Sequence, residues 1–112
     1  MWKHTLPFDH DTCLLIFCHD RFYVVLVFYH HFDTHEIKLV QGDTIYICTD
    51  GFADQFSGQD GKKLMTKKFK EILLNIQDKS MKEQEQYLDS FIENWKAGTE
   101  QVDDILVIGV RL

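Results

Sequence analysis

Two apolar runs separated by only three residues lie near the start of the sequence, and they constrain the fold more than any other feature. Residues 12–18 and 22–29 are rich in β-branched and aromatic side chains, and residues 19–21 (His-Asp-Arg) join them. Runs of this length and composition are typical of buried β-strands. Because so short a connection favours a hairpin, the sequence predicts a sheet that begins with two antiparallel strands.

Two further strands and a final one are expected later in the chain. Residues 35–39 alternate polar and apolar side chains, residues 41–43 (Gln-Gly-Asp) have the composition of a turn, and residues 44–49 form another apolar run. This order is typical of a second hairpin. Residues 105–112 are almost continuously apolar, which predicts a central strand of the sheet.

Two amphipathic helices are expected between these strands. In residues 62–77 apolar side chains recur at helical spacing, opposite a face that carries lysines. Ser80 and Glu83 have the spacing of a capping box, which places the start of a second helix near residue 81. Gly98 is a typical residue for its C-terminal cap. We therefore expect an α+β fold in which an antiparallel β-sheet layer is covered by an antiparallel pair of helices.

Composition narrows the class of protein. The chain has 112 residues, 45% of them hydrophobic and 27% charged, which is typical of one globular domain. The net charge of −6 disfavours nucleic-acid binding, because such a field repels polyanions. The longest apolar run, residues 22–29, is far shorter than the roughly 20 residues of a membrane-spanning helix. We see no signal-peptide pattern and expect a cytoplasmic location, in which the three cysteines are reduced.

Acidic residues stand at the ends of two predicted strands. Asp50 follows the run 44–49, and Asp103 shortly precedes the run 105–112. If these strands are antiparallel in one sheet, the end of the first and the start of the second share an edge, which brings the two acids together. Clustered carboxylates call for a hard divalent cation or a shared proton, and oxygen-only ligands favour Mg²⁺ or Mn²⁺ over Zn²⁺. The residue types alone favour a simpler interpretation, a turn at Asp50-Gly51 and a solvated acid at Asp103.

These acids belong to two separated motifs that together resemble those of a known protein family. Segment 42–56 contains Thr49-Asp50-Gly51, segment 100–109 contains Asp103-Asp104, and the two expected helices lie between them. This arrangement resembles the C-terminal half of the metal-dependent PPM (type 2C) protein serine/threonine phosphatases. It is most similar to their bacterial branch of sporulation stage II E-type phosphatases, and the resemblance covers residues 34–112.

The resemblance implies half of a PPM β-sandwich, with a binuclear Mn²⁺ or Mg²⁺ site that hydrolyses phosphoserine or phosphothreonine in bacterial signal transduction. Asp50 and Asp103 match metal-binding aspartates of the family. Asp54 matches an acidic position with a supporting role, and Asp104 falls where many members have Asn. A hydroxide held between two metal ions can attack phosphorus without a phospho-enzyme intermediate. The implied partner is a phosphoprotein substrate or a regulatory protein.

The N-terminal part of the chain departs from the family pattern. Members carry an Asp-Gly and a Gly-His-Gly motif that supply further metal ligands, and residues 1–49 contain neither. We therefore divide one compact domain into a β-rich leader, residues 1–33, that is diverged from or unrelated to the family, and a phosphatase-like half-domain, residues 34–112. Whether this chain alone is an enzyme stays open, because its ligand set is incomplete.

The alternative function is a catalytically inactive, phosphatase-like module for interaction or oligomerisation. A half-domain exposes a sheet edge and an apolar face, so we expect a homo-oligomer or a poorly soluble monomer unless the leader hairpin covers them.

Two other groups of residues are weaker candidates for a site. His30, His31 and His35 lie close together in the sequence, and imidazoles at such spacing can bind Zn²⁺ or Ni²⁺. On a strand the three would not share one face, so strand-end histidines are the simpler interpretation. The lysines of residues 62–70 can attract phosphate groups or an acidic partner, but a run of charge on a helix face is usually solvated.

Overall fold

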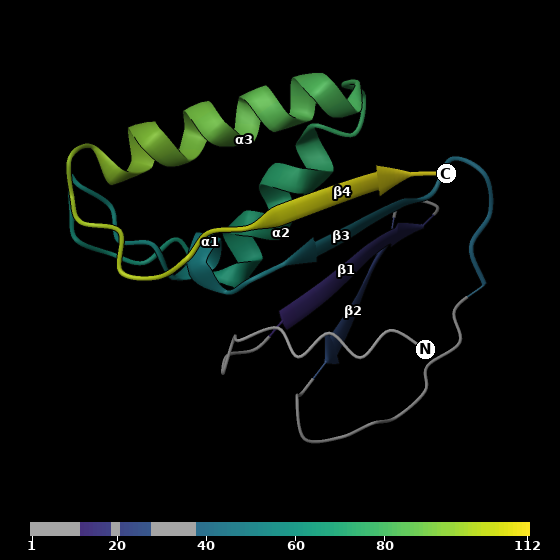
Figure 1. Ribbon diagram of the computed structural model, residues 1–112, viewed down its shortest axis with the longest axis horizontal. Helices are drawn as coiled ribbons and strands as arrows, with labels where there is room; N and C mark the ends of the chain where they lie inside the picture. The colour runs from purple at the N-terminus through teal and green to yellow at the C-terminus, as the bar shows by residue number, and fades with distance from the viewer. Residues whose placement is uncertain (1–11, 19–20, 28–37) are drawn as a thin grey trace.

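The computed structural model describes residues 12–18, 21–27 and 38–112, and within them it has the predicted α+β fold (Figure 1). None of the described helices is long and apolar enough to cross a membrane. In chain order the elements are β1 (Thr12–Cys18), β2 (Arg21–Val27), β3 (Thr44–Cys48), α1 (Gly51–Asp54), α2 (Thr66–Asn75), α3 (Met81–Lys96) and β4 (Val107–Arg111).

The four strands form one antiparallel sheet in the order β2-β1-β3-β4. Leu15 of β1 pairs with Val24 of β2 on one side and with Tyr46 of β3 on the other. Tyr46 in turn pairs with Gly109 of β4. The predicted hairpin of β1 and β2 is confirmed, and β3 lies in the middle of the sheet with a neighbour on each side.

Two predictions about the strands were wrong. The second hairpin, between residues 35–39 and 44–49, does not form, because β1 and β4 occupy both edges of β3. Residues 38 and 39 belong to no strand, and residues 35–37 lie outside the described part of the chain. The final strand is not central either. Among the described strands β4 pairs with β3 alone, and it therefore forms an edge of the sheet.

The hydrophobic core lies between β3 and the helices. Tyr46 and Cys48 are only 1% and 2% exposed, whereas Ile47, which points to the other face of β3, is 41% exposed. This alternation is the period-two pattern of a strand with one covered face. In Figure 1, α3 runs alongside β4 and α2 lies behind the strands. The buried residues that the helices and loops add to this core are Phe52, Ala53, Leu64, Phe69, Ile72, Leu73, Ile76, Leu88 and Ile92.

The ends of α3 follow the sequence signals. The Glu83 backbone N–H donates to the Ser80 hydroxyl oxygen at 3.2 Å, which satisfies one of the unpaired donors of the first turn. At the other end the chain enters the left-handed region at Ala97 (φ +45°) and Gly98 (φ +87°). The predicted start near residue 81 and the stop before Gly98 are confirmed. The preceding helix is shorter than the 62–77 pattern suggested, since α2 begins at Thr66.

A buried polar network fixes α3 over the middle of the sheet. The Tyr46 hydroxyl donates to Oε1 of Gln84 at 2.6 Å and accepts from the side-chain amide of Gln77. Burial raises the pKa of Tyr46 above its ordinary value, against the opposing effects of these hydrogen bonds and of the Arg111 charge. The phenol is therefore neutral at pH 7 and keeps its proton for Gln84. This contact holds the first turns of α3 in place beside β4.

Candidate metal-binding site

The candidate site lies where β3 ends and the segment leading into β4 begins. Asp50 comes two residues after Cys48, the last residue of β3, and Cys48 pairs with Val107, the first residue of β4. The antiparallel pairing on which the sequence prediction depended is therefore present. It brings the segment 103–106 alongside residues 49–51, although more than fifty residues separate them in the sequence.

Thr49 joins the two segments with three hydrogen bonds. Its hydroxyl donates to the Asp104 carbonyl at 2.8 Å and accepts from the Leu106 backbone N–H at 3.2 Å. Its own backbone N–H donates to the Leu106 carbonyl at 3.1 Å. The hydroxyl of Thr49 thus uses both its donor and its acceptor capacity on the opposite segment. Thr49 therefore positions the two segments, a role that its place next to Asp50 in the Thr49-Asp50-Gly51 motif did not predict.

Gly51 allows these segments to approach so closely. A Cβ atom at this position would lie 2.2 Å from the Asp104 carbonyl oxygen and 3.2 Å from Cγ1 of Ile105. Any side chain would push residues 104 and 105 away from the end of β3. The glycine of the Asp50-Gly51 pair is therefore required for contact between backbones, in addition to its place in a turn.

The carboxylates of Asp50, Asp54 and Asp103 interact at this junction. Burial raises the pKa of Asp50, and the negative charges of Asp54 and Asp103 raise it further. Asp54 lies one helical turn after Asp50, with its backbone N–H donating to the Asp50 carbonyl at 2.9 Å. The Asp103 carboxylate accepts the Asp104 backbone N–H at 2.8 Å. The predicted proximity of Asp50 and Asp103 thus has an electrostatic consequence, which is mutual repulsion of ionised groups.

Asp104 contributes to the junction through its backbone. Its carbonyl is the group that Thr49 binds and that Gly51 approaches, while the residue as a whole is exposed. This placement agrees with the interpretation of Asp104 as a neighbour of the site.

The carboxylate oxygens at this junction are of the kind that binds Mn²⁺ or Mg²⁺, but the described residues supply too few of them for a metal centre. Carboxylate oxygens are the ligands these hard cations prefer. Yet among residues 38–112 no three His, Cys, Asp or Glu side chains converge so that they could hold a metal ion. The described residues therefore do not form a binuclear centre by themselves. The cluster of His30, His31 and His35 lies outside the described residues.

Comparison with known families shows to which protein family the chain belongs. The family model described as Stage II sporulation protein E (SpoIIE) matches residues 10–112. The chain belongs to this family, which is part of the PPM phosphatases. The match begins earlier than residue 34, where the motif-based resemblance began. PPM phosphatases generally depend on Mn²⁺ or Mg²⁺.

A solved structure has the same fold as this SpoIIE-family chain. It is described as the SiaA-PP2C domain of Pseudomonas aeruginosa, and it superimposes with a TM-score of 0.80 at 21% sequence identity. The likeness covers 92% of this chain and 44% of that chain. The SpoIIE-family chain thus spans less than half the length of the solved one. No curated protein matches it significantly.

Proposed function

We propose that this chain carries the C-terminal part of a metal-dependent protein serine/threonine phosphatase domain. Its substrate would be phosphoserine or phosphothreonine in a signalling protein of the bacterial cytoplasm. Membership of the SpoIIE family supports the reaction class. The observation that carries the proposal is the repelling pair of Asp50 and Asp103, which the Thr49 hydrogen bonds and the Gly51 contact hold at one junction.

In this proposal Asp50 and Asp103 bind a metal ion, which is why two carboxylates that repel each other are held together. Ionised carboxylates held together destabilise a fold unless a cation neutralises them, so Asp50 and Asp103 would supply part of the oxygen ligands of Mn²⁺ or Mg²⁺. Asp54 would support them from the next helical turn. The remaining ligands would come from residues other than 38–112, since the described acids do not complete a centre.

Two measurements on the purified chain test this function. The first is Mn²⁺ binding, followed by electron paramagnetic resonance of the free ion. The second is Mn²⁺-dependent hydrolysis of para-nitrophenyl phosphate. Asp50→Asn and Asp103→Asn should each weaken Mn²⁺ binding at least tenfold and abolish turnover. Asp104→Asn is the matched control and should leave both signals within about threefold, because its carboxylate is exposed beside the site.

The outcomes separate the phosphatase from the alternative function. Mn²⁺ binding that Asp50→Asn and Asp103→Asn leave unchanged contradicts the metal site. Binding without any turnover contradicts catalysis by this chain alone. In that case the phosphatase-like interaction module is the better description. That second candidate is favoured by one observation, the half-exposed apolar side chains in and beside β4, which are Leu106, Ile108, Val110 and Leu112.

A further inference from the structure

A patch of positive charge lies beside the Asp50 junction, on a chain that is acidic as a whole. Five of the twelve Lys and Arg residues fall within residues 62–70, a stretch that contains no Asp or Glu. Because the net charge is −6, the rest of the chain is more acidic still. Four of these lysines are exposed, and they define the basic patch: Lys62, Lys63, Lys67 and Lys68.

Two contacts hold the patch against α1, the helix that begins at the candidate site. The Met65 backbone N–H donates to the Ala53 carbonyl at 2.7 Å. The Phe69 ring of α2 packs on the Phe52 ring of α1, with 4.5 Å between their centres. The start of α2 and the lysines on either side of Met65 are therefore fixed relative to α1.

The first of these contacts also limits the distance between the patch and the candidate metal ligands. Lys63 and Lys67 are each two residues from Met65, and Asp50 is three residues from Ala53. The backbone of each lysine therefore lies within about 20 Å of Asp50 along this path, a length that roughly six residues of extended peptide span. A peptide that placed a phosphate at the junction could reach the patch with residues a few positions away.

The charges of the patch are not neutralised by acids of the same chain. Among residues 38–112 the ion pairs lie on α3, and none includes a lysine of the patch. Asp60, the acid nearest to the patch in the sequence, accepts the Lys62 backbone N–H at 3.0 Å. The Lys63 ammonium lies 5.6 Å from the centre of the Phe56 ring, a cation–π contact that orients it and leaves its charge in place. The patch is thus available to an anion from outside.

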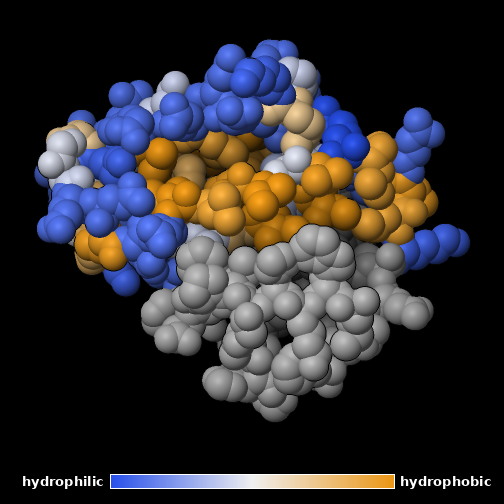
Figure 2. All heavy atoms as spheres, in the orientation of Figure 1, coloured by the Kyte–Doolittle hydropathy of each residue, from blue (hydrophilic) through white to orange (hydrophobic). Residues whose placement is uncertain are grey.

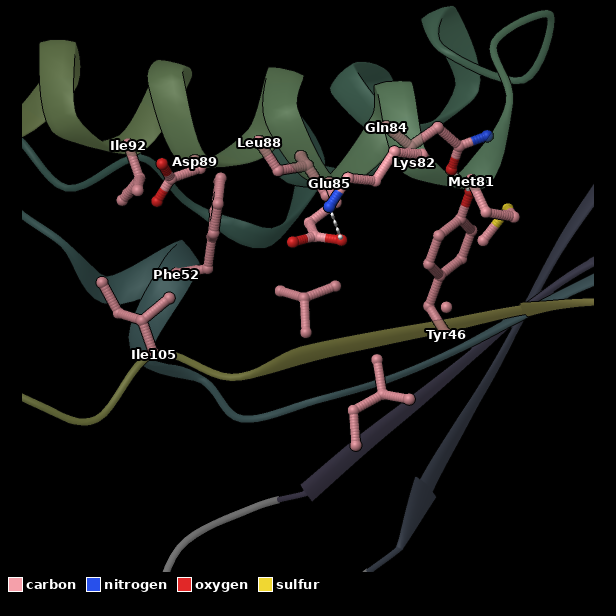
Figure 3. A pocket seen from close by; sticks show the side chains of 13 residues that line it. Tyr46, Phe52, Met81, Lys82, Gln84, Glu85, Leu88, Asp89, Ile92 and Ile105 are labelled. Carbon is pink, nitrogen blue, oxygen red and sulfur yellow. Dashed lines mark hydrogen bonds and ion pairs between the residues drawn. The ribbon is translucent and has the colours of Figure 1, made fainter.

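The groove between α3 and β4 suits an anion less well. Its volume is about 510 Å³, and its lining is mainly apolar. Among the described residues that line it Lys82 is the only lysine, and Figure 3 shows it in an ion pair with Glu85 at 3.6 Å. Figure 2 shows the apolar residues gathered between α3 and the strands, whereas the outer face of α3 and the end of the molecule near α1 are mainly hydrophilic.

We propose that the basic patch binds acidic side chains that flank the phosphorylated serine or threonine of the substrate, within about six residues of it. This substrate class rests on the proposed function, since the phosphate itself would lie at the Asp50 junction. The lysines would offset the repulsion between an anionic peptide and an acidic protein. A long polyanion such as a nucleic acid would extend past the patch onto the acidic remainder of the surface, which disfavours it.

Binding of two matched peptides in EDTA tests the patch in the absence of metal. Both peptides are fluorescein-labelled, unphosphorylated and built around a central Thr. One carries Glu at three positions on each side of the Thr, and the other carries Gln at the same positions. Fluorescence anisotropy at low ionic strength gives the two Kd values. The parent chain should bind the Glu peptide at least about fivefold more tightly, because several weak ion pairs act together.

A pair of double variants separates the patch from the overall charge of the protein. Lys62→Gln with Lys67→Gln removes two charges from the patch, and Lys38→Gln with Lys82→Gln removes two from exposed lysines elsewhere. Both variants have the same net charge. The patch variant should weaken binding of the Glu peptide about fivefold, and the control variant should weaken it less than about twofold.

Three results would overturn the inference. The first is equal binding of the Glu and Gln peptides by the parent chain. The second is an equal loss in the two double variants, because the overall field alone would then attract the peptide. The third is a short oligothymidylate that binds more tightly than the Glu peptide with the same dependence on Lys62 and Lys67, which would assign the patch to a nucleic acid.

Phosphorylated forms of the two peptides, incubated with the chain in Mn²⁺, distinguish failure of this inference from failure of the phosphatase proposal. Lysine-dependent binding in EDTA without any release of phosphate in Mn²⁺ supports the patch and contradicts catalysis by this chain. Where phosphate is released, the Glu phosphopeptide should have a KM at least about fivefold lower than the Gln phosphopeptide. Release with equal KM values supports the enzyme and contradicts the role of the patch.

Discussion

Replacing Asp50 by Asn should stabilise the metal-free protein at neutral pH. Burial, followed by the charges of Asp54 and Asp103, raises the pKa of Asp50 in the folded state. A group whose pKa is raised on folding stabilises the fold fully only below its unfolded pKa, about 3.9 for Asp. That stability is lost as the pH rises through the folded pKa. At pH 7 the ionised carboxylate therefore opposes folding, and an uncharged amide of the same shape removes the opposition.

The size of the gain is limited by the exposure of the junction. Neighbouring carboxylates that are partly exposed repel by about 1 kcal/mol, because solvent screens much of the interaction. For a domain of roughly 100 residues, 1 kcal/mol raises the melting temperature by about 4 °C. The change is small in absolute terms, but its sign is opposite to that of most substitutions at partly buried positions.

Thermal unfolding followed by circular dichroism in EDTA, from pH 3 to pH 8, measures this effect. Asp50→Asn should melt about 4 °C above the parent chain at pH 7 and together with it near pH 3, where both states bind the proton. Asp89→Asn, at an exposed residue of α3, is the control and should change the melting temperature by less than about 1 °C. A lower melting temperature for Asp50→Asn at pH 7, or a gain that persists unchanged at pH 3, would refute the reasoning.

Two further pairs of substitutions test the packing at the junction and in the core. Gly51→Ala should lower the free energy of unfolding, measured by urea denaturation, by about 2 kcal/mol or more, because its Cβ would lie 2.2 Å from the Asp104 carbonyl oxygen. Gly61 has open space around it but a φ of +70°, so Gly61→Ala should lower the same free energy by only about 1 kcal/mol. Leu73→Ala should cost about 2–5 kcal/mol, since Leu73 is fully buried, whereas Leu74→Ala, 45% exposed, should cost less than about 1 kcal/mol. Similar losses within either pair would contradict the packing described.

Local signals in the sequence were sufficient for much of the fold. The three-residue connection between residues 18 and 22 predicted the first hairpin, because so short a link favours antiparallel strands. The Ser80 hydroxyl and Gly98 predicted the limits of α3, because each satisfies the geometry of a helix end within a few residues. These features depend on neighbours in the chain, so no knowledge of the tertiary structure was needed.

The strand order depended on contacts that are distant in sequence. Residues 105–112 have the apolar composition of a central strand, but composition records only that side chains are apolar on both faces. It does not record how many neighbours pair with the backbone. β4 is an edge strand among the described elements, and on one of its faces Ile108 and Val110 are half-exposed. The second hairpin failed for a related reason, because β1 takes the place beside β3 that residues 35–39 were expected to fill.

The candidate site shows why one motif supported two interpretations. Asp50-Gly51 was interpreted as either a turn or part of a metal site, and the structure makes these roles dependent on each other. Gly51 must lack a side chain so that Asp104 can reach the end of β3, and this approach brings Asp103 within electrostatic reach of Asp50. A turn that only reversed the chain would not need that contact. The close backbone approach therefore favours the site.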